Sequence, residues 1–289
     1  MMDLNELRLE IDKIDEQLVK LFVQRMNVSA RIADYKKAND LPIFVPSRET
    51  AKLQEIAQMA GPDMEVYSRV LYDLLFELSR GYQSKRNANR TPLYEQISTA
   101  ISETDRLLPR DSTVACFNDA EKNLQMVFRK LFGQGAMMPF KNLEGTLSAV
   151  AQCLCEYGII SVESSKKELY DLLAKEHLFI VRCVRLQSGR QYLCIGKQLE
   201  IFPGADRSTI RMALSDRPGA LYKVLSRLYT LGINVVGLDS RPIYDNNFRG
   251  MFYFDLETSI YSEEFVQLMC ELDDLCEEFS YLGSYSEVV

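Results

Sequence analysis

The sequence has no tryptophan and only one histidine, His177, among its 289 residues. A single histidine on a mixed segment is typical of a surface or packed side chain rather than of a catalytic or metal-binding group. Basic residues are also in deficit, because 41 acidic residues outnumber 34 lysines and arginines and give a net charge of −7. Nucleic acids and anionic membranes are bound by basic faces, so neither is expected as the main partner.

The cysteines do not form the pattern of a disulfide framework. Their number is odd and they are scattered, which favours reduced and mostly buried thiols. Cys153 and Cys155 form a Cys-x-Cys pair, but no second pair stands at the spacing of a zinc site. We therefore expect no metal and no organic cofactor. The seven cysteines are Cys116, Cys153, Cys155, Cys183, Cys194, Cys270 and Cys276.

Long hydrophobic runs are absent as well. No apolar stretch approaches the roughly 18 to 20 residues needed to span a bilayer. The first residues, Met-Met-Asp-Leu-Asn-Glu, lack the basic and apolar regions of a secretion signal. We therefore expect a cytoplasmic protein with no membrane segment. Its length is sufficient for two or three domains, each with a core of its own.

Among the features that are present, the stretch from Leu4 to Gln83 organises the chain. Apolar residues recur at alternating spacings of three and four from Leu4 to Tyr35, which predicts one long helix that ends near residues 36–39. Arg25 stands where this apolar seam would place another aliphatic residue. A buried guanidinium without a partner is costly, so we expect Arg25 to face an anion or a carboxylate.

Lys36 follows Arg25 at a spacing that turns both side chains the same way. The two lie about 20° apart around the helix and about 16 Å apart along it, so they can converge on one small dianion. Arg8 lies about 100° from Arg25 by the same count, too far round to share that site within one subunit. Arg8 can instead serve the site of a partner subunit.

A second helix is expected after a short loop. Ser47 is the predicted N-cap, Arg48 and Glu49 follow in the first turn, and the helix continues to about Ala60, before Gly61-Pro62. The side chains of Arg48 and Glu49 then stand at a helix start beside a loop, where they can reach a pocket.

A third helix is expected from about Met64 to Arg86. Ser79 and Gln83 are four residues apart and project together near its C-terminal end. The first helix, at about 50 Å, is longer than one short domain can cover, so we expect it to pack against a second copy. The sequence therefore predicts an all-helical homodimer and leaves open whether dimers assemble further.

Together these residues resemble the all-helical chorismate mutases. The resemblance covers residues 1–86, and it differs at Val45, where the family often has an aspartate near the substrate hydroxyl. The plainer alternative is a helical hairpin that only dimerises and carries surface charges. The matching pattern consists of Arg8, Arg25, Lys36, the pair Arg48 and Glu49, Ser79 and Gln83.

The resemblance implies that Arg8 of a partner subunit and Arg25 clamp the two carboxylates of chorismate. It also implies that Lys36 and Gln83 donate hydrogen bonds to the ether oxygen. Because the rearrangement to prephenate is pericyclic, it needs no nucleophile and no proton transfer, only positioning and charge stabilisation. Gln83 is a neutral donor, so activity is not expected to require acidic pH.

The same resemblance gives roles to the remaining polar residues. Glu49 accepts a hydrogen bond from the ring hydroxyl, and Arg48 and Ser79 complete the binding shell. Because Val45 replaces the aspartate, recognition of the hydroxyl rests on Glu49 and the backbone.

After a polar linker, the composition changes to short apolar runs that alternate with helical stretches, which is typical of an α/β domain. The segment 157–165, followed by Tyr170-Asp171-Leu172-Leu173, resembles the middle of prephenate dehydratases. The expected elements are strands at 113–117, 158–162 and 178–186 and helices that end near Phe132 and span 143–156 and 168–175.

This second resemblance breaks down at the family's catalytic motifs. The glycine-rich opening loop is replaced by residues 118–123, which contain no glycine, and Glu-Asn-Ser becomes Glu163-Ser164-Ser165. The catalytic Thr-Arg-Phe aligns with residues 190–192, Arg-Gln-Tyr. Because the sequence passes from Arg185 almost at once to that point, one of the family's two lobes is expected to be missing. We therefore expect a shortened and inactive dehydratase-like domain.

From about Ser208 the pattern predicts the order β-α-β-β-α-β. Two short motifs resemble the effector motifs of the ACT domains that are attached to prephenate dehydratases, and the resemblance implies phenylalanine as the effector at an interface of paired domains. A helix start near Ala220 suits the carboxylate of an amino acid. The alternative is a dimerisation module without a ligand. The motifs are Gly219, Ala220 and Leu221, and Asp239, Ser240, Arg241 and Pro242.

The predicted architecture is therefore multi-domain, α followed by α/β, with a C-terminal βαββαβ ACT domain of ferredoxin-like fold. The predicted function is chorismate mutase activity in phenylalanine biosynthesis. The alternatives are a bifunctional chorismate mutase/prephenate dehydratase and a non-catalytic phenylalanine-binding regulatory protein. The expected boundaries are 1–88 for the mutase domain, 89–111 for a linker, 112–205 for the dehydratase-like domain and 206–289 for the ACT domain.

Overall fold

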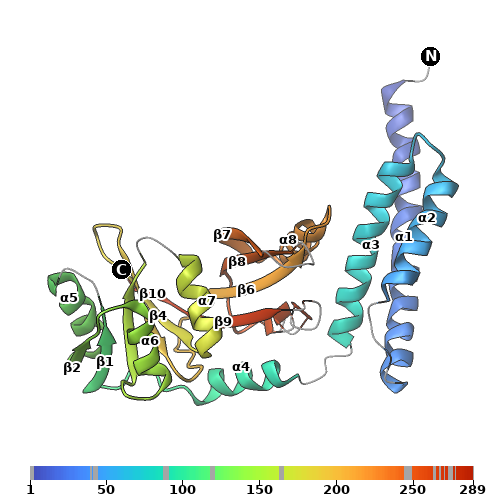
Figure 1. Ribbon diagram of the computed structural model, residues 1–289. Helices are drawn as coiled ribbons and strands as arrows, with labels where there is room; N and C mark the ends of the chain where they lie inside the picture. The colour runs from blue at the N-terminus through green and yellow to red at the C-terminus, as the bar shows by residue number, and fades with distance from the viewer. Residues whose placement is uncertain are drawn as a thin grey trace. The chain divides into compact units, whose positions relative to one another are not determined.

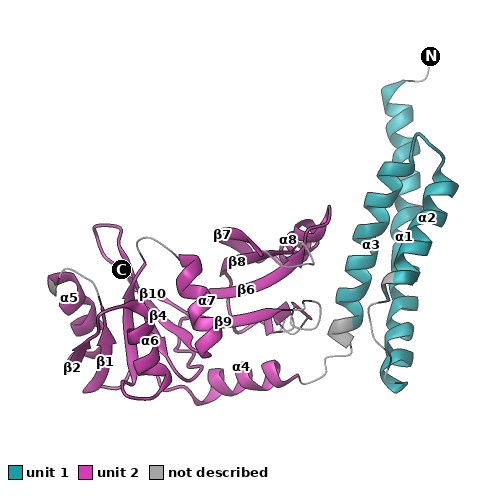
Figure 2. Ribbon diagram, in the orientation of Figure 1, with its two compact units in different colours: residues 1–89 teal, residues 90–289 magenta. Residues whose placement is uncertain are grey.

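The computed structural model divides the chain into two compact units, residues 1–89 and 90–289 (Figure 2). Each unit is described by itself. The residues that the structure describes are 3–39, 41, 45–86, 91–117, 121–162, 166–243, 249–262, 265, 266, 268, 269, 271, 272, 276 and 278–288. Among the described helices, none combines the length and apolarity that crossing a membrane requires.

The N-terminal unit consists of three helices (Figure 1), which are α1 (Leu4–Ala38), α2 (Pro46–Ala60) and α3 (Glu65–Arg86). The predicted long helix is confirmed as α1. It begins at a capping box, in which the Glu6 side chain accepts from the Asp3 backbone N–H at 3.1 Å, and it has Lys36 and Lys37 in its last turn. Asn39 is its C-cap, which agrees with the predicted end near residues 36–39.

The predicted N-cap of the second helix is wrong by two residues. Val45 is the N-cap of α2 and Pro46 occupies its first turn, so Ser47 lies inside the helix. Proline has a φ suited to helix geometry and lacks the N–H that would be unsatisfied at this place, which explains the earlier start. The helix ends at Gly61, whose φ is 78°.

The apolar seam of α1 is only partly covered within this chain. Ser29, Ala30 and Ala33 are buried in the C-terminal half. The N-terminal half is exposed, with side chains such as Ile14 and Leu18 about half accessible. The described part of the chain thus leaves a long apolar stripe that its own three helices do not cover.

The second unit contains two sheets (Figure 1). The larger is six-stranded in the order β10-β4-β5-β3-β1-β2. In it β1 pairs in parallel with β2 and β3, and β5 pairs antiparallel with β3 and β4. The strands are β1 (Ser112–Cys116), β2 (Gly135–Pro139), β3 (Tyr157–Ser161), β4 (Phe179–Arg185), β5 (Gln191–Gly196) and β10 (Glu287–Val288), and the helices between them are α5 (Glu121–Phe132), α6 (Leu143–Ala151) and α7 (Lys166–Glu176).

The α/β expectation for this region is confirmed, with some differences. Strands β2, β5 and β10 were not predicted as strands. The predicted helix 143–156 stops at Ala151, because Gln152 is the C-cap and Cys153 has a φ of 58°, outside the helical region. The turn between β4 and β5 is short, since the Leu186 N–H donates to the Arg190 carbonyl at 2.9 Å.

The smaller sheet is antiparallel and four-stranded in the order β7-β8-β6-β9. This is the strand order of a β-α-β-β-α-β unit in which the two middle strands of the sheet are the first and third. The second helix of the predicted order is described only in part, with helical residues at 265, 266, 268, 269, 271 and 272. The elements are β6 (Arg207–Ser215), α8 (Ala220–Thr230), β7 (Asn234–Ile243), β8 (Arg249–Glu257) and β9 (Phe279–Tyr285).

The expected linker at 89–111 is not simply a linker, because it contains the helix α4 (Pro92–Glu103). Thr91 caps this helix by accepting from the Tyr94 N–H at 3.1 Å. Ile97 is fully buried against residues of the four-stranded sheet, including Phe254. The polar composition at the start of the segment concealed this buried helix, which belongs to the core of the second unit.

The two sheets of this unit are joined by one continuous stretch of chain. Strand β9 ends at Tyr285, and β10 then pairs in parallel with β4. Glu287 accepts two hydrogen bonds from Arg185, at 2.6 and 3.0 Å, and one from Gln191 at 3.1 Å. Near the junction, Gly283 has a φ of 125°, and a Cβ there would stand 2.3 Å from the Ile180 carbonyl oxygen.

We predict that Gly283→Ala lowers the free energy of unfolding of the second unit by about 4 kcal/mol, because backbone strain and a clash with β4 act together. Gly204→Ala is the matched control, since Gly204 also has a positive φ, 83°, but has open space around it. Its expected cost is about 1 kcal/mol. Denaturant unfolding measures both, and equal losses in the two variants would contradict the close approach at Gly283.

Candidate active site

Arg25 lies on α1 and points toward α3. Its Nη1 donates to the Leu75 carbonyl at 3.1 Å and to Ser79 Oγ, and its guanidinium stands 5.6 Å from the centre of the Phe76 ring. Burial lowers the pKa of Arg25 from its usual value, and the nearby Tyr72 and Glu49 offset part of this effect. An anion or a carboxylate was expected beside Arg25. The structure instead places a carbonyl, a hydroxyl and a ring face in contact with it, and Glu49 lies near enough to affect its pKa.

Lys36 lies three turns further along α1, where charged residues at the start of α2 affect its pKa. Burial and the positive charge of Arg48 lower the pKa of Lys36, and Glu49 offsets part of the shift. Since Glu49 acts on both Arg25 and Lys36, the structure brings these three residues and Arg48 into one neighbourhood. A cation held beside another cation is well prepared to receive an anionic ligand.

Ser79 and Gln83 lie one turn apart on α3 and are both buried, at 5% and 7% exposure. Ser79 Oγ donates to the Leu75 carbonyl at 2.6 Å. The buried Oε1 of Gln83 has no hydrogen-bond partner among the described residues. An unsatisfied buried amide is costly, and an amide can present either its oxygen or its nitrogen at the same place. Gln83 is thus poised to bond to a molecule held beside it.

Arg80 belongs to this neighbourhood and sequence reasoning missed it. Its guanidinium bonds to both carboxylate oxygens of Glu49 and also to Glu77, so it joins α3 to the start of α2. Its side chain is only 11% exposed. The available signal was a charged residue between Ser79 and Gln83, but sequence alone did not distinguish it from an exposed helix charge. Arg80 orients the carboxylate that was expected to accept from a substrate hydroxyl.

Arg8 is the one predicted residue that this chain does not bring to the site. It is exposed near the start of α1, and 17 residues of helix separate it from Arg25, which is about 26 Å along the axis. All seven predicted residues lie in the N-terminal unit, and Arg8 stands apart from the other six. Those six supply cations, hydroxyl and amide donors and one carboxylate, which suit the binding of a compact dianion.

The family model that describes chorismate mutase type II matches residues 7–84. The N-terminal unit is a chorismate mutase domain. Its matched range contains all seven of the site residues predicted from the sequence. It also contains Arg80, which places that residue within the mutase domain.

Comparison with known proteins extends the likeness beyond the mutase domain. The chain is 26% identical to the bifunctional chorismate mutase/prephenate dehydratase of Aquifex aeolicus, in an alignment that covers 100% of this chain and 99% of that protein. The alignment has 365 positions, more than the 289 residues of this chain, so the relative has stretches without a counterpart here.

Two solved structures resemble the fold of the region after the mutase domain. Prephenate dehydratase from Streptococcus mutans is 21% identical, with a TM-score of 0.50, and the match covers 62% of this chain and 100% of that one. Prephenate dehydratase from Arthrobacter aurescens, in complex with L-Phe, is 14% identical, with a TM-score of 0.51 and coverage of 60% and 89%. The second unit therefore has a prephenate dehydratase-like fold.

The predicted motif residues of the dehydratase-like region are only partly described. Asn118, Asp119 and Ala120 and the Glu163–Ser165 stretch lie outside the described residues. Arg190 is exposed in the turn before β5. Residues of both sheets line a cavity of about 160 Å³, and its wall includes Lys166, Arg185, Arg207, Asp255 and Glu287.

The predicted effector motifs occupy two places in the smaller sheet. Gly219 is the N-cap of α8 and has a φ of 88°, which explains the need for glycine at that turn, and Ala220 and Leu221 follow in the first turn. Residues 239–242 are exposed on β7, an edge strand whose one sheet neighbour is β8. The two motifs thus lie on different elements, the start of α8 and the strand β7.

We predict that Arg80→Gln lowers the free energy of unfolding of the mutase domain by about 2 kcal/mol, because Glu49 and Glu77 both lose a largely buried cation. Arg69→Gln on the same helix is the matched control. Its ion pair with Glu65 is more than 40% exposed at both side chains, so its loss should cost at most about 0.5 kcal/mol. Thermal unfolding followed by circular dichroism compares them. Equal effects would show that Arg80 is not a structural partner of Glu49.

Proposed function

We propose that the mutase domain of this chain converts chorismate to prephenate in phenylalanine biosynthesis. The observation that carries the proposal is the position of Arg25, a partly buried cation that bonds to Leu75 and Ser79 of α3 and shares the influence of Glu49 with Lys36. These residues can hold a dianion and stabilise negative charge. A pericyclic rearrangement requires both and needs no nucleophile.

The proposed roles follow from the charge of each group. Arg25 binds one substrate carboxylate, and Lys36 and Gln83 donate to the ether oxygen as the bond to it breaks. Arg48 adds positive charge beside Lys36, and Ser79 holds the guanidinium of Arg25 in place. Donors fixed in a partly dry site stabilise the developing charge more strongly than water does, because they need not reorient.

Glu49 is proposed to accept a hydrogen bond from the substrate's ring hydroxyl. Arg80 already bonds to both oxygens of this carboxylate, but a carboxylate has about four acceptor positions and can accept from a hydroxyl as well. Because Val45 lacks a polar side chain, Glu49 and the backbone carry this recognition.

A second copy of the chain is proposed to complete the site. Arg8 cannot reach the position of Arg25 within one chain, and the N-terminal half of α1 leaves its apolar stripe exposed. Pairing of two such stripes would bury side chains such as Leu7 and Ile11, each worth roughly 1.5–3 kcal/mol when fully buried. In a homodimer of this kind, Arg8 of one copy binds the second carboxylate at the other copy's site.

Arg25→Ala is expected to lower kcat/KM for chorismate at least about a hundredfold, since one fixed donor to the substrate dianion is lost. Arg69→Ala, at a half-exposed arginine on α3, serves as the matched control and should keep near-normal activity. The disappearance of chorismate, followed spectroscopically, measures both variants. Full activity in Arg25→Ala would overturn the assignment of the site.

The lowered pKa of Lys36 predicts the alkaline side of the pH profile. The protonated amine is the hydrogen-bond donor, so activity is lost as pH rises through a pKa below the usual 10.5. In Lys36→Arg the group stays charged to much higher pH, so kcat/KM should be lower but should not fall in that range. A decline at the same pH in the variant would assign the titration to another group.

We further propose that the dehydratase-like region of this chain is inactive. Its β4 and β5 are joined by a tight turn, at the point where the prephenate dehydratases have a second lobe. The long gaps in the alignment with the Aquifex aeolicus enzyme support the same interpretation. Without two lobes, no cleft can close over prephenate and exclude water.

The alternative is a bifunctional enzyme, which the full-length likeness to a bifunctional relative favours. Supplying prephenate directly separates the two possibilities. The inactive interpretation predicts that phenylpyruvate forms no faster with the full-length protein than without it, at neutral pH. Formation that depends on the protein would establish the bifunctional activity.

The four-stranded sheet is proposed to be an ACT domain that binds phenylalanine. The strand order, the glycine turn at Gly219 and the exposed edge-strand motif at residues 239–242 support this proposal. The solved Arthrobacter aurescens relative is a complex with L-Phe. The alternatives are a dimerisation module that binds no ligand, and a phenylalanine-binding regulatory protein without catalysis; direct titration with phenylalanine, described below, tests the binding.

A further inference from the structure

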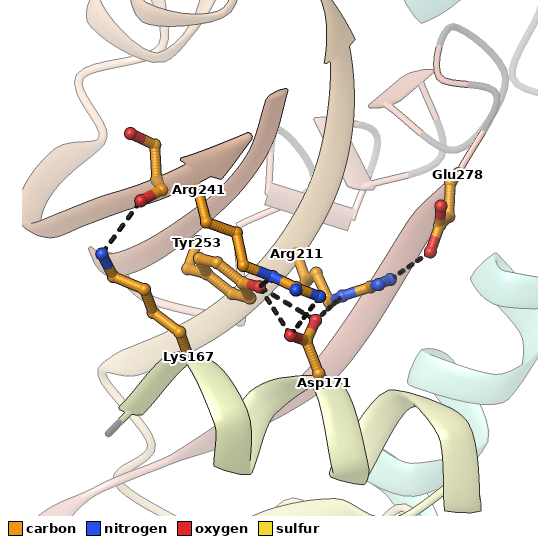
Figure 3. A network of polar contacts seen from close by, with 7 residues as sticks. Lys167, Asp171, Arg211, Arg241, Tyr253 and Glu278 are labelled. Carbon is orange, nitrogen blue, oxygen red and sulfur yellow. Dashed lines mark hydrogen bonds and ion pairs between the residues drawn. The ribbon is translucent and has the colours of Figure 1, made fainter. Parts of the chain in front are cut away.

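Asp171 on α7 is the centre of a network of charged and polar groups (Figure 3). Its carboxylate accepts from Arg211 Nε at 2.7 Å and from Tyr253 OH at 2.9 Å, and Arg241 Nη2 stands 2.5 Å from it. The three donors come from β6, β8 and β7 of the four-stranded sheet. One carboxylate on a helix of the α/β region therefore holds three neighbouring strands.

The network is partly shielded from solvent, which strengthens its hydrogen bonds and ion pairs. The side chain of Arg211 is only 10% exposed, and its Nη1 also donates to Glu278 at 2.6 Å. Burial alone would lower the pKa of Arg211, but its bonds to Asp171 and Glu278 outweigh this and raise it. Charge-assisted bonds in such a place are roughly twice as strong as neutral ones. α7 and the sheet are thus held in one fixed arrangement.

Arg241 connects this network to the proposed effector motif. Its Nε donates to Tyr253 OH at 2.7 Å, while its Nη2 reaches Asp171. Lys167, also on α7 (Figure 3), donates to the Ser240 carbonyl at 2.9 Å and lies 3.4 Å from Asp239. Three consecutive residues of the motif are therefore held by two side chains of α7 and by one tyrosine.

The position of β7 makes these contacts important. β7 is an edge strand, with β8 as its one partner in the sheet, and the side chains of residues 239–242 are exposed. An edge strand has backbone hydrogen bonds to a neighbouring strand on one side only. Contacts from another element therefore decide how far it can move on the other side. The direction of Arg241 is set jointly by Asp171 of α7 and by Tyr253 of β8.

α7 also contributes to the wall of the cavity between the two sheets. Lys166 Nζ and Tyr170 OH both bond to Asp255 at 3.1 Å, and all three residues line that cavity. The same helix thus contacts the proposed effector motif through Lys167 and Asp171, and it lines the cavity through Lys166 and Tyr170. These contacts connect α7 to β7 on one side and to the cavity on the other.

We propose that Asp171 is a positioning residue for the effector site: it fixes Arg241 and strand β7 in the arrangement that binds phenylalanine, and it couples that binding to α7. This inference rests on the proposed binding of phenylalanine by the smaller sheet. By linkage, whatever stabilises α7 in its present position also strengthens phenylalanine binding.

The test compares full-length wild type with Asp171→Asn. Calorimetric titration with L-phenylalanine measures affinity, and hydrogen exchange of residues 166–176 measures the response of α7. Wild type is expected to bind, with slower exchange in α7 upon binding. Asp171→Asn is expected to bind at least fivefold more weakly and to lose the α7 response, because the amide cannot hold two guanidinium groups.

Asp111→Asn is the matched control, because Asp111 is an exposed residue of the same unit whose positive φ of 67° suits asparagine. It should behave as wild type. If Asp171→Asn does not fold, Tyr253→Phe removes only the hydroxyl between Arg241 and Asp171 and should weaken binding and the α7 response in the same direction.

The outcomes separate this inference from the function on which it rests. Failure of wild type to bind phenylalanine contradicts the proposed effector site, and the inference with it. Binding by wild type, with unchanged affinity and an unchanged α7 response in Asp171→Asn or in Tyr253→Phe, contradicts the role of Asp171 alone.

Discussion

The mutase domain depends on how one guanidinium is accommodated between α1 and α3. Arg25 occupies a position in the apolar seam of α1, and α3 supplies the carbonyl of Leu75, the hydroxyl of Ser79 and the ring of Phe76 around it. These neighbours carry no full negative charge, so the cation is held without being neutralised. That balance lets a structural contact between two helices also be a binding site for an anion.

The second unit has a comparable arrangement, in which the central group is an anion instead of a cation. There a carboxylate, Asp171, is surrounded by two guanidinium groups and a hydroxyl. It joins a helix of the six-stranded region to the smaller sheet, while the continuous chain from β9 into β10 joins the sheets themselves. Asp171 and the chain from β9 into β10 are thus two of the links between the dehydratase-like region and the smaller sheet.

Much of this fold could be predicted from the sequence, because several signals agreed. The long helix α1 combined apolar periodicity with basic residues in its last turn, and the βαββαβ order of the last segment combined strands, glycine turns and a helix. The elements that were missed had weaker local signals. β10 is two residues long and exists through pairing with β4, and α4 follows a polar stretch that concealed Ile97. β2, at 135–139, contains two methionines and a proline, which do not mark a strand by propensity.

The candidate site was predictable to a similar degree. Arg25 stood out because a charge interrupted an apolar pattern, and Lys36 followed from helix geometry. Arg80 could not be distinguished from an ordinary surface charge until α2 brought Glu49 to it. Contacts between elements that are distant in sequence are set by tertiary packing, which no local pattern records. The same reason explains why Asp171 was seen only as part of a motif and not as the centre of a network.

The most direct measurement is activity in mixtures of two inactive variants, Arg8→Ala and Arg25→Ala, refolded together. If each site takes Arg25 from one copy and Arg8 from the other, a mixed dimer has one intact site, and an equal mixture should recover about a quarter of wild-type chorismate turnover. Each variant alone should stay inactive. Mixtures that remain as inactive as the separate variants would contradict a site built between two copies.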